Sequence, residues 1–253
     1  LISENPGLVE IGVFALWAEL KRAPVSALVG VMVKIENPPR KPFIARGSGV
    51  IRCDDCRLPK EVCICEWRYT VEAKCRFWLL THRYEVYKPT NTGRLIADTI
   101  GHTRIFEWSR TEPSAELLAA LDDPRHAPCL VFPAGEDYRQ RMIEDIEQDP
   151  RMPQDRIPVF IILDGTWRQA RRMFRHSRYL QHLPVIEPQT DRLSRYKLRR
   201  STIDHHLCTA EVAVALLEQA GDQAAADHLE GYFERFNTNY IATRRRWAKR
   251  EPE

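Results

Sequence analysis

The chain has 253 residues, of which 43% are hydrophobic and 29% are charged, and these values exclude wholesale disorder. A chain of this length can bury one large core, or a core domain with a small appendage. The formal net charge of +3 is too small by itself to indicate a nucleic-acid-binding protein, so the placement of the charges must decide that question.

Residues 1–47 contain no motif and end in a segment rich in proline and basic residues, so we interpret them as an N-terminal extension. The first residues lack the basic cluster of a secretory signal. Two apolar stretches, near 11–18 and 23–33, are separated by charged residues, and neither reaches the roughly 20 residues that a membrane-spanning helix needs. We therefore expect a soluble, cytoplasmic protein with reduced thiols and no membrane partner.

Residues 48–70 contain four of the 7 cysteines, arranged as Cys53-x-x-Cys56 followed by Cys63-x-Cys65. Four soft thiolates at this spacing can surround Zn²⁺ tetrahedrally, so we predict a small zinc-knuckle segment with four cysteine ligands. Such a site has no open coordination position, and its role would be structural or in RNA contact. The alternative is four unliganded cysteines. The other cysteines are expected to be small buried apolar residues: Cys75, Cys129 and Cys208.

The segment 71–250 alternates short apolar runs, rich in β-forming residues, with helical patterns, which predicts an α/β domain. Because the runs are apolar almost throughout, we expect strands that are covered on both faces, as in a mostly parallel sheet flanked by helices. The predicted strands are 77–80, 103–106, 129–132 and 159–163, and the predicted helices are 115–121 with Ser114 as cap, 166–176, 209–219 with Thr209 as cap, and 222–250.

Each predicted strand is followed by a polar segment, and ligands of such sheets bind beyond the carboxyl ends of the strands. Asp164-Gly165-Thr166-Trp167 ends the most hydrophobic strand and opens a basic helix. A strand-end carboxylate at a glycine turn fits a catalytic or nucleotide-binding corner. The alternative is structural: Asp164 or Thr166 caps the helix, and Trp167 packs into the core.

Two further segments have residues that suit a ligand site. Asn91, Thr92 and Gly93 are turn formers whose backbone can approach a ligand closely, although a surface turn explains them equally well. Gly135 and Glu136 follow the strand 129–132. Gly135 allows close approach and Glu136 can accept a hydrogen bond from an amine or a hydroxyl, while the alternative for this pair is a helix N-terminus.

Basic residues cluster in three places: on the helix after Trp167, around Tyr196 in segment 192–200, and beside Trp247 in segment 244–246. Cations interleaved with aromatic residues suit phosphate contact and base stacking, which favours single-stranded or folded RNA over duplex DNA. The alternative is a solvated charged face.

Taken in order, these segments resemble the DTW-domain family of tRNA-uridine aminocarboxypropyltransferases over about residues 52–240. The chain departs from the family at Cys208, where the family usually has serine, and residues 1–47 have no counterpart. The matching pieces are Arg52-Cys53-x-x-Cys56 with Cys63-x-Cys65, Leu80-Thr81-His82, Thr90-Asn91-Thr92-Gly93-Arg94-Leu95, Phe132-Pro133-Ala134-Gly135-Glu136, Leu163-Asp164-Gly165-Thr166-Trp167 with Gln169-Ala170-Arg171, Tyr196-x-Leu198-Arg199, and Cys208-Thr209-Ala210-Glu211.

The resemblance implies a SPOUT-like, knotted fold that binds S-adenosylmethionine in the loops after the strands. It also implies transfer of the 3-amino-3-carboxypropyl group to N3 of a uridine in tRNA, with release of methylthioadenosine. The alternatives are a SPOUT-type RNA methyltransferase and a non-catalytic zinc-knuckle RNA-binding protein.

On this hypothesis the catalytic turn consists of Asp164, Thr166 and Trp167. Asp164 removes the uridine proton or orients the uracil edge, and Trp167 either stacks on a base or packs. The residues expected to line the cofactor pocket are Asn91, Thr92, Gly93, Gly135, Glu136, Thr209 and Glu211, and those expected to contact RNA phosphates are Arg168, Arg171, Arg199 and Arg200.

Overall fold

The computed structural model describes residues 50–190, 194–196 and 207–248, with side chains described as far as residue 243. The predicted extension 1–47 and the predicted phosphate contacts Arg199 and Arg200 lie outside this part of the chain. The described residues form one 6-stranded sheet, in the order β2-β1-β5-β3-β6-β4, in which each pair of neighbouring strands is parallel. The predicted α/β class with a parallel sheet is therefore confirmed, whereas the knot stays a prediction.

The predicted strands and helices occur in the predicted order, and the described residues form three further strands or α-helices, α2, β4 and β6. The strands are β1 (Arg76–Thr81), β2 (Arg104–Glu107), β3 (His126–Val131), β4 (Met142–Ile143), β5 (Ile157–Asp164) and β6 (Val185–Ile186). The α-helices are α2 (Gly93–Thr99), α3 (Ala115–Leu121), α4 (Trp167–His176), α5 (Thr209–Gln219) and α6 (Gln223–Ala248). The 3-10 helices are η2 (Lys60–Val62), η3 (Cys65–Trp67), η4 (Glu136–Arg141) and η5 (Arg178–Leu180).

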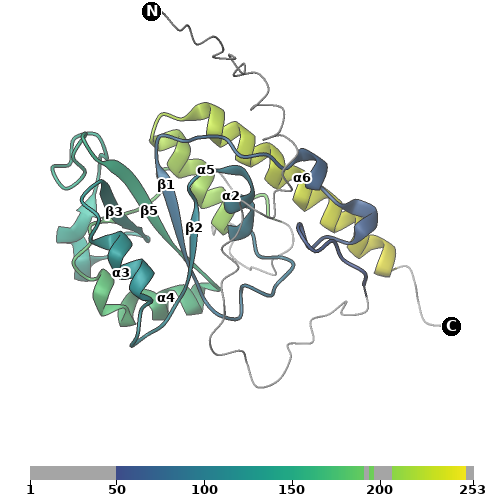
Figure 1. Cartoon of the computed structure of the whole chain (residues 1–253), viewed down its shortest axis with the longest axis horizontal. Helices are drawn as coiled ribbons and strands as arrows, with labels where there is room; N and C mark the ends of the chain where they lie inside the picture. The colour runs from purple at the N-terminus through teal and green to yellow at the C-terminus, as the bar shows by residue number, and fades with distance from the viewer. Residues whose placement is uncertain (1–49, 191–193, 197–206, 249–253) are drawn as a thin grey trace, which may run out of the picture. The chain divides into compact units, whose positions relative to one another are not determined.

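The core has two halves, one on each face of the sheet, because successive residues of a strand point to opposite faces. On β1, Phe77 and Leu79 belong to the half that packs against α2, α5 and α6. Trp78 and Leu80 belong to the other half, which packs against α3 and α4. Figure 1 shows these two groups of helices on opposite sides of the sheet. This burial of both faces explains why the strands are apolar almost throughout.

Local capping explains where the predicted helices begin. The Ser114 hydroxyl accepts a hydrogen bond from the Leu117 N–H at 3.2 Å and caps α3 as predicted. Helix α5 begins at Thr209 as predicted, but the expectation that Thr209 is its cap is wrong. Cys208 occupies the cap position, and the Thr209 hydroxyl instead donates to Asp164 at 2.9 Å.

The cysteine-rich segment packs against the same core as the sheet. Leu58 and Ile64 are fully buried in the half of the core that contains α6. The Asn239 side chain of α6 also donates to the Val62 carbonyl at 3.2 Å. The segment therefore shares its apolar core with the main domain.

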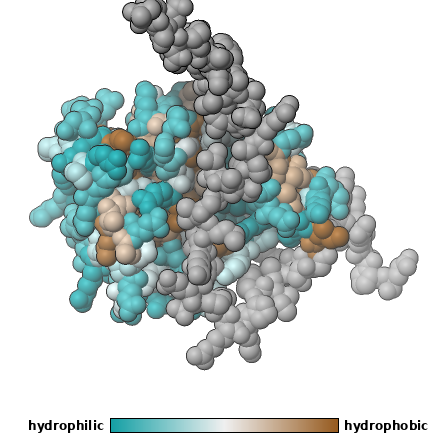
Figure 2. All heavy atoms as spheres, in the orientation of Figure 1, coloured by the Kyte–Doolittle hydropathy of each residue, from teal (hydrophilic) through white to brown (hydrophobic). Residues whose placement is uncertain are grey.

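The described surface is mostly polar. Figure 2 shows one face of the molecule, largely hydrophilic, with apolar spots separated by polar side chains. Large apolar side chains that are exposed include Ile51, Tyr69 and Trp167. Among the described residues, no helix has both the length and the apolar character needed to cross a membrane.

Candidate functional site

The carboxyl ends of β1 and β5 lie side by side at the point where the connections diverge. Thr81, the last residue of β1, is in register with Asp164, the last residue of β5. The chain leaves β1 through α2, toward β2 on one side, and leaves β5 through α4, toward β6 on the other. In open parallel sheets this divergence opens a crevice, which is the usual position of a ligand site.

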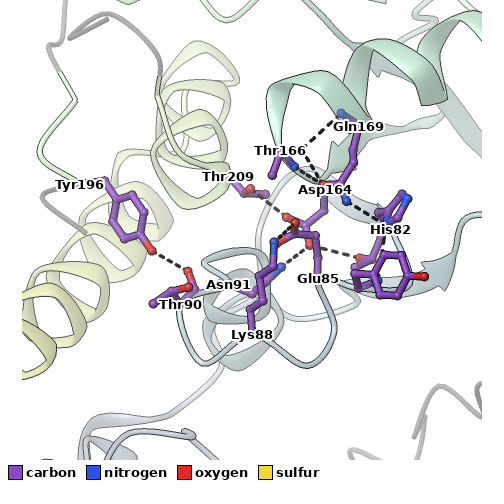
Figure 3. A network of polar contacts seen from close by, with 12 residues as sticks. His82, Glu85, Lys88, Thr90, Asn91, Asp164, Thr166, Gln169, Tyr196 and Thr209 are labelled. Atoms are coloured by element: carbon purple, nitrogen blue, oxygen red, sulfur yellow. Dashed lines mark hydrogen bonds and ion pairs between the residues drawn. The ribbon is translucent and has the colours of Figure 1, made fainter. Parts of the chain in front are cut away.

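Asp164 is the centre of a buried polar network at this point. Its side chain is almost fully buried, although it is a carboxyl group at a strand end. Oδ2 accepts hydrogen bonds from Asn91 Nδ2 at 2.7 Å and from Thr81 Oγ1 at 3.3 Å, and Oδ1 accepts one from Thr209 Oγ1 at 2.9 Å. Figure 3 shows Asn91 and Thr209 converging on the carboxylate. Asp164 therefore does not cap α4.

The start of α2 is fitted to this carboxylate. Asn91 Oδ1 accepts the Arg94 N–H at 3.2 Å, so the amide orientation is fixed and Nδ2 faces Asp164. At Gly93, a Cβ atom would lie 3.0 Å from the Asp164 carboxyl atoms, which is closer than a side chain normally packs. The predicted Asn91 and Gly93 therefore contact Asp164 directly, and segment 91–93 is not a surface turn.

Thr92 joins the starts of α2 and α5. Its side chain is buried, and its Oγ1 accepts the Ala210 N–H at 3.4 Å. Thr92 and Thr209 therefore hold the starts of α2 and α5 together at the end of β5. Both were predicted for one pocket, and the structure brings them together there.

The electrostatic environment makes Asp164 a stronger base than an exposed aspartate. Burial raises the pKa of Asp164 because the charged form loses its hydration, and the negative charge of Glu85 adds to the rise. Hydrogen bonds from Asn91 and Thr209 oppose the shift because they stabilise the carboxylate. A carboxylate with a raised pKa is suited to removing a proton from a weakly acidic N–H group.

A pocket of about 160 Å³ opens beside this network. Its charged side chains are Asp164, Glu85 and Lys88, and the last two form an ion pair with 2.5 Å between Oε1 and Nζ. Glu85 and Lys88 could not be predicted as pocket residues, because a charged turn is polar whether or not it binds a ligand. The lining residues are Glu85, Lys88, Thr90, Asn91, Thr92, Asp164, Gly165, Thr166, Tyr196 and Thr209.

Thr166 caps α4 and at the same time orders a histidine. Thr166 and Gln169 form a capping box, in which Gln169 Oε1 accepts the Thr166 N–H at 2.7 Å. This contact fixes the Gln169 amide, so that its Nε2 donates to His82 Nδ1 at 3.1 Å. Burial lowers the pKa of His82, and the neutral ring must then have its proton on Nε2. The Thr166 hydroxyl also donates to Gln169 Oε1 at 2.7 Å, so Thr166 helps to hold the amide that contacts His82.

Trp167 is not among the residues that line the pocket. Its side chain is 42% exposed, and it stacks on Phe132 with 5.4 Å between ring centroids. The suggestion that Trp167 is a core residue is therefore wrong, because its ring lies at the surface. Arg168 and Arg171 follow it on the exposed side of α4.

Gly135 and Glu136, although predicted for the pocket, do not line the pocket found beside Asp164. They begin η4, so the alternative of a helix start describes them correctly. A Cβ atom at Gly135 would lie 2.7 Å from the Tyr138 ring, whose hydroxyl donates to the Pro133 carbonyl at 2.6 Å. The packing of Tyr138 therefore explains this glycine.

Glu211, although predicted for the pocket, is not among the residues that line it. Its Oε2 accepts hydrogen bonds from Ser194 Oγ at 2.8 Å and from the Cys208 N–H at 2.7 Å, and its Oε1 accepts the Arg195 N–H at 2.5 Å. The neighbouring Tyr196 lines the pocket and donates to the Thr90 carbonyl at 2.6 Å (Figure 3). Glu211 therefore braces a wall of the site.

The four predicted metal ligands come together. The sulfur atoms of Cys53 and Cys65 are 3.6 Å apart, as are those of Cys56 and Cys63, and all four lie within 4.8 Å of one another. Tetrahedral zinc with four thiolates needs sulfur atoms about 3.8 Å apart. The donor set and its spacing therefore fit one tetrahedral metal ion. The Arg94 guanidinium also donates to the Asp55 carbonyl within this segment at 3.3 Å, and so connects it with α2.

Comparison with known proteins agrees with this geometry. A family model, described as DTW domain, matches residues 50–241. Two curated relatives, both called tRNA-uridine aminocarboxypropyltransferase 2, come from Macaca fascicularis and Mus musculus; each is 24% identical over 176 residues, which cover 66% of this chain and 56% of the relative. The chain thus spans a little over half the length of these relatives, and no solved structure matches it. Because the family model covers most of the sequence, the chain belongs to the DTW domain family.

Proposed function

We propose that this protein transfers the 3-amino-3-carboxypropyl group of S-adenosylmethionine to N3 of a uridine in tRNA and releases methylthioadenosine. Membership of the DTW domain family and the activity named for the two relatives support a tRNA-modifying transferase. The observation that carries the proposal is the buried Asp164 carboxylate, which lines a pocket at the divergence of β1 and β5.

The reaction requires one bond to form, one to break and one proton to leave. Uridine N3 bonds to the γ-carbon of the methionine moiety while the bond between that carbon and sulfur breaks, and its electron pair neutralises the sulfonium. The N3 proton must go to a base. Asp164 would accept it, because its raised pKa increases proton affinity and it lines the pocket. Thr81, Asn91 and Thr209 would hold this base in place.

The co-substrate would bind along the loops after β1 and β5. The pocket of about 160 Å³ is smaller than the roughly 300 Å³ of typical small-molecule sites, so it suits one end of the molecule. Asn91, Thr92 and Thr209 are our candidates for its walls, and Gly93 would contribute by packing against Asp164. Glu211 would support the site indirectly, and the part of Gly135 and Glu136 would be limited to the neighbouring loop.

The tRNA would approach over α4. Arg168 and Arg171 are exposed on this helix, and no ion pair engages them in the part of the chain that the structure describes. Phosphate contacts by such residues position RNA, whereas the exposed Trp167 ring offers a surface for a base. Arg199 and Arg200, outside the described residues, would extend this basic surface.

We propose zinc as the ion of the Cys53, Cys56, Cys63 and Cys65 site, because four thiolates at tetrahedral spacing suit this metal. With all four positions filled by protein, zinc would supply structural support rather than chemistry. Free cysteines suit a reducing compartment, and we propose that the protein acts in the cytoplasm.

The test is incubation of the purified protein with unmodified tRNA and S-adenosylmethionine, followed by mass analysis of nucleosides and small products. Aminocarboxypropyluridine together with methylthioadenosine would support the proposal. A methylated nucleoside with S-adenosylhomocysteine would instead identify an RNA methyltransferase. Binding of tRNA without consumption of S-adenosylmethionine, for every tRNA tried, would leave the non-catalytic zinc-knuckle protein.

A further inference from the structure

The turn between β1 and α2 places charged side chains along the pocket at regular intervals. Its backbone hydrogen bonds recur every three residues: Glu85 N–H to the His82 carbonyl, Lys88 N–H to the Glu85 carbonyl, and Asn91 N–H to the Lys88 carbonyl. Residues separated by three positions in such a chain of turns lie on the same side. Glu85, Lys88 and Asn91 all line the pocket as a result, and Figure 3 shows them beside Asp164.

The Glu85–Lys88 ion pair is partly buried beside the pocket. The side chains are 9% and 28% exposed. Removing two charges from water is costly, and replacing such a pair with apolar residues is often neutral or stabilising. Beyond their mutual contact, Glu85 Oε2 and the other Lys88 N–H groups form no hydrogen bond among the described residues. Each charge therefore has hydrogen-bonding capacity left for a ligand in the pocket.

The charges of the pocket complement those of S-adenosylmethionine. With Asp164 ionised, two carboxylates face one ammonium group, which leaves one excess negative charge. S-adenosylmethionine has a sulfonium, an α-ammonium and an α-carboxylate group, which leave one excess positive charge. Oppositely charged groups with matching hydrogen-bonding capacity form the stronger class of hydrogen bonds.

We propose that the Glu85–Lys88 pair binds the amino-acid end of S-adenosylmethionine, with Lys88 on the α-carboxylate and Glu85 on the α-ammonium group. This inference rests on the proposed function and goes further, because it assigns two residues to the group that is transferred. Binding this group by both charged ends limits which carbon attached to sulfur can face the nucleophile. Glu85 and Lys88 would therefore determine that the aminocarboxypropyl group, and not the methyl group, is transferred.

The test measures binding by calorimetry, without tRNA, for three ligands. S-adenosylmethionine has both charged groups, decarboxylated S-adenosylmethionine lacks the carboxylate, and methylthioadenosine lacks the whole amino-acid end. For Lys88→Met we expect about 10- to 100-fold weaker binding of S-adenosylmethionine alone. For Glu85→Gln we expect a similar loss for both ammonium-containing ligands. Methylthioadenosine has no amino-acid end, so its dissociation constant for both variants should stay within about twofold of the wild-type value. Lys74→Met, which removes an exposed lysine near the other end of β1, is the matched control and should change nothing.

The outcomes separate the inference from the proposed function. If wild type binds neither S-adenosylmethionine nor methylthioadenosine, the proposed function fails and the inference fails with it. If wild type binds both but Lys88→Met weakens all three ligands equally or none, the pair is only structural and the inference alone is overturned. Should Lys88→Met prove unstable on heating, Lys88→Arg keeps the charge and must retain the preference for the carboxylate-containing ligand.

Discussion

Replacing Asp164 with asparagine removes the negative charge of this side chain without changing its size. Asn91 Nδ2 is a fixed donor, so the oxygen of the new amide must take the place of Oδ2. The new NH₂ group then faces Thr209 Oγ1, whose hydroxyl can rotate and accept. Thr81 still donates to the amide oxygen. Asp164→Asn therefore keeps the hydrogen bonds of the network and loses only the negative charge and the base.

The expected loss of activity follows from the role of a general base. Such a group contributes roughly 10²- to 10⁴-fold to the rate, which corresponds to about 3–5 kcal/mol of activation free energy. Single-turnover formation of methylthioadenosine, with saturating tRNA and S-adenosylmethionine, measures this step. Asp155→Asn, at an exposed aspartate, is the control and should react at the wild-type rate.

The same substitution has a second signature, in stability. Because folding raises the pKa of Asp164, its stabilising contribution is present below the unfolded pKa of ~3.9 and is lost as the pH rises through the folded value. The variant lacks this loss, so its free energy of unfolding relative to wild type should increase as the pH rises above about 4. Urea denaturation across this range gives the comparison. A folded variant that reacts within tenfold of wild type would refute the assignment of the base, and a relative stability that falls with pH would refute the burial argument.

Three further predictions concern other parts of the molecule. Gly93→Ala should lower the free energy of unfolding by ~1–3 kcal/mol, because the added Cβ has no room beside Asp164. Gly231→Ala, where nothing lies within 4 Å of the added Cβ, should raise the free energy of unfolding by up to ~1 kcal/mol. Equal effects of the two substitutions in urea denaturation would contradict this reasoning. Cys56→Ser should reduce bound zinc, measured by mass spectrometry, from about one ion per chain and lower the melting temperature; full retention of metal would argue against the four-cysteine site. The double substitution Arg168→Glu and Arg171→Glu should weaken tRNA binding about 10-fold or more and reduce the dependence of the binding constant on salt concentration. Filter binding at several salt concentrations measures both effects. An unchanged salt dependence would exclude phosphate contacts by these two residues.

The elements that could be predicted from the sequence are those whose signals are local. Helices α3 and α4 begin where Ser114 and Thr166 cap them, and both caps are visible in the sequence. Strands β1, β3 and β5 are long apolar runs because helices cover both faces of the sheet. The order of the strands in the sheet could not be predicted from local signals, since it depends on contacts between distant segments.

Helix α2 was missed for a related reason. It begins with Gly93, a poor helix former, and unlike the equally short α3 it has no side-chain cap at its start. Its position depends on packing against Asp164 and on the contact between Thr92 and Ala210. Strands β4 and β6, with 2 residues each, are also too short to show a period.

The candidate site was predicted only in part. Asp164, Asn91, Thr92 and Thr209 meet as expected, because strand ends and helix starts gather at one edge of a parallel sheet. Glu85 and its partner in the turn were missed, since their inward direction follows from the hydrogen bonds of that turn.

The place of β5 between β1 and β3 has a consequence for synthesis of the chain. β1 and β2 are complete early and can pair with each other, but β3 has to wait, because the strand that separates it from β1 ends only at Asp164. Pairing of such distant segments is slow compared with local folding. On the ribosome, β1 would therefore keep one unpaired edge and β3 two unpaired edges until β5 emerges, and such edges favour aggregation. The Asp164 carboxylate, at the end of β5, would therefore reach its place only after β1, β2 and β3 have been synthesised.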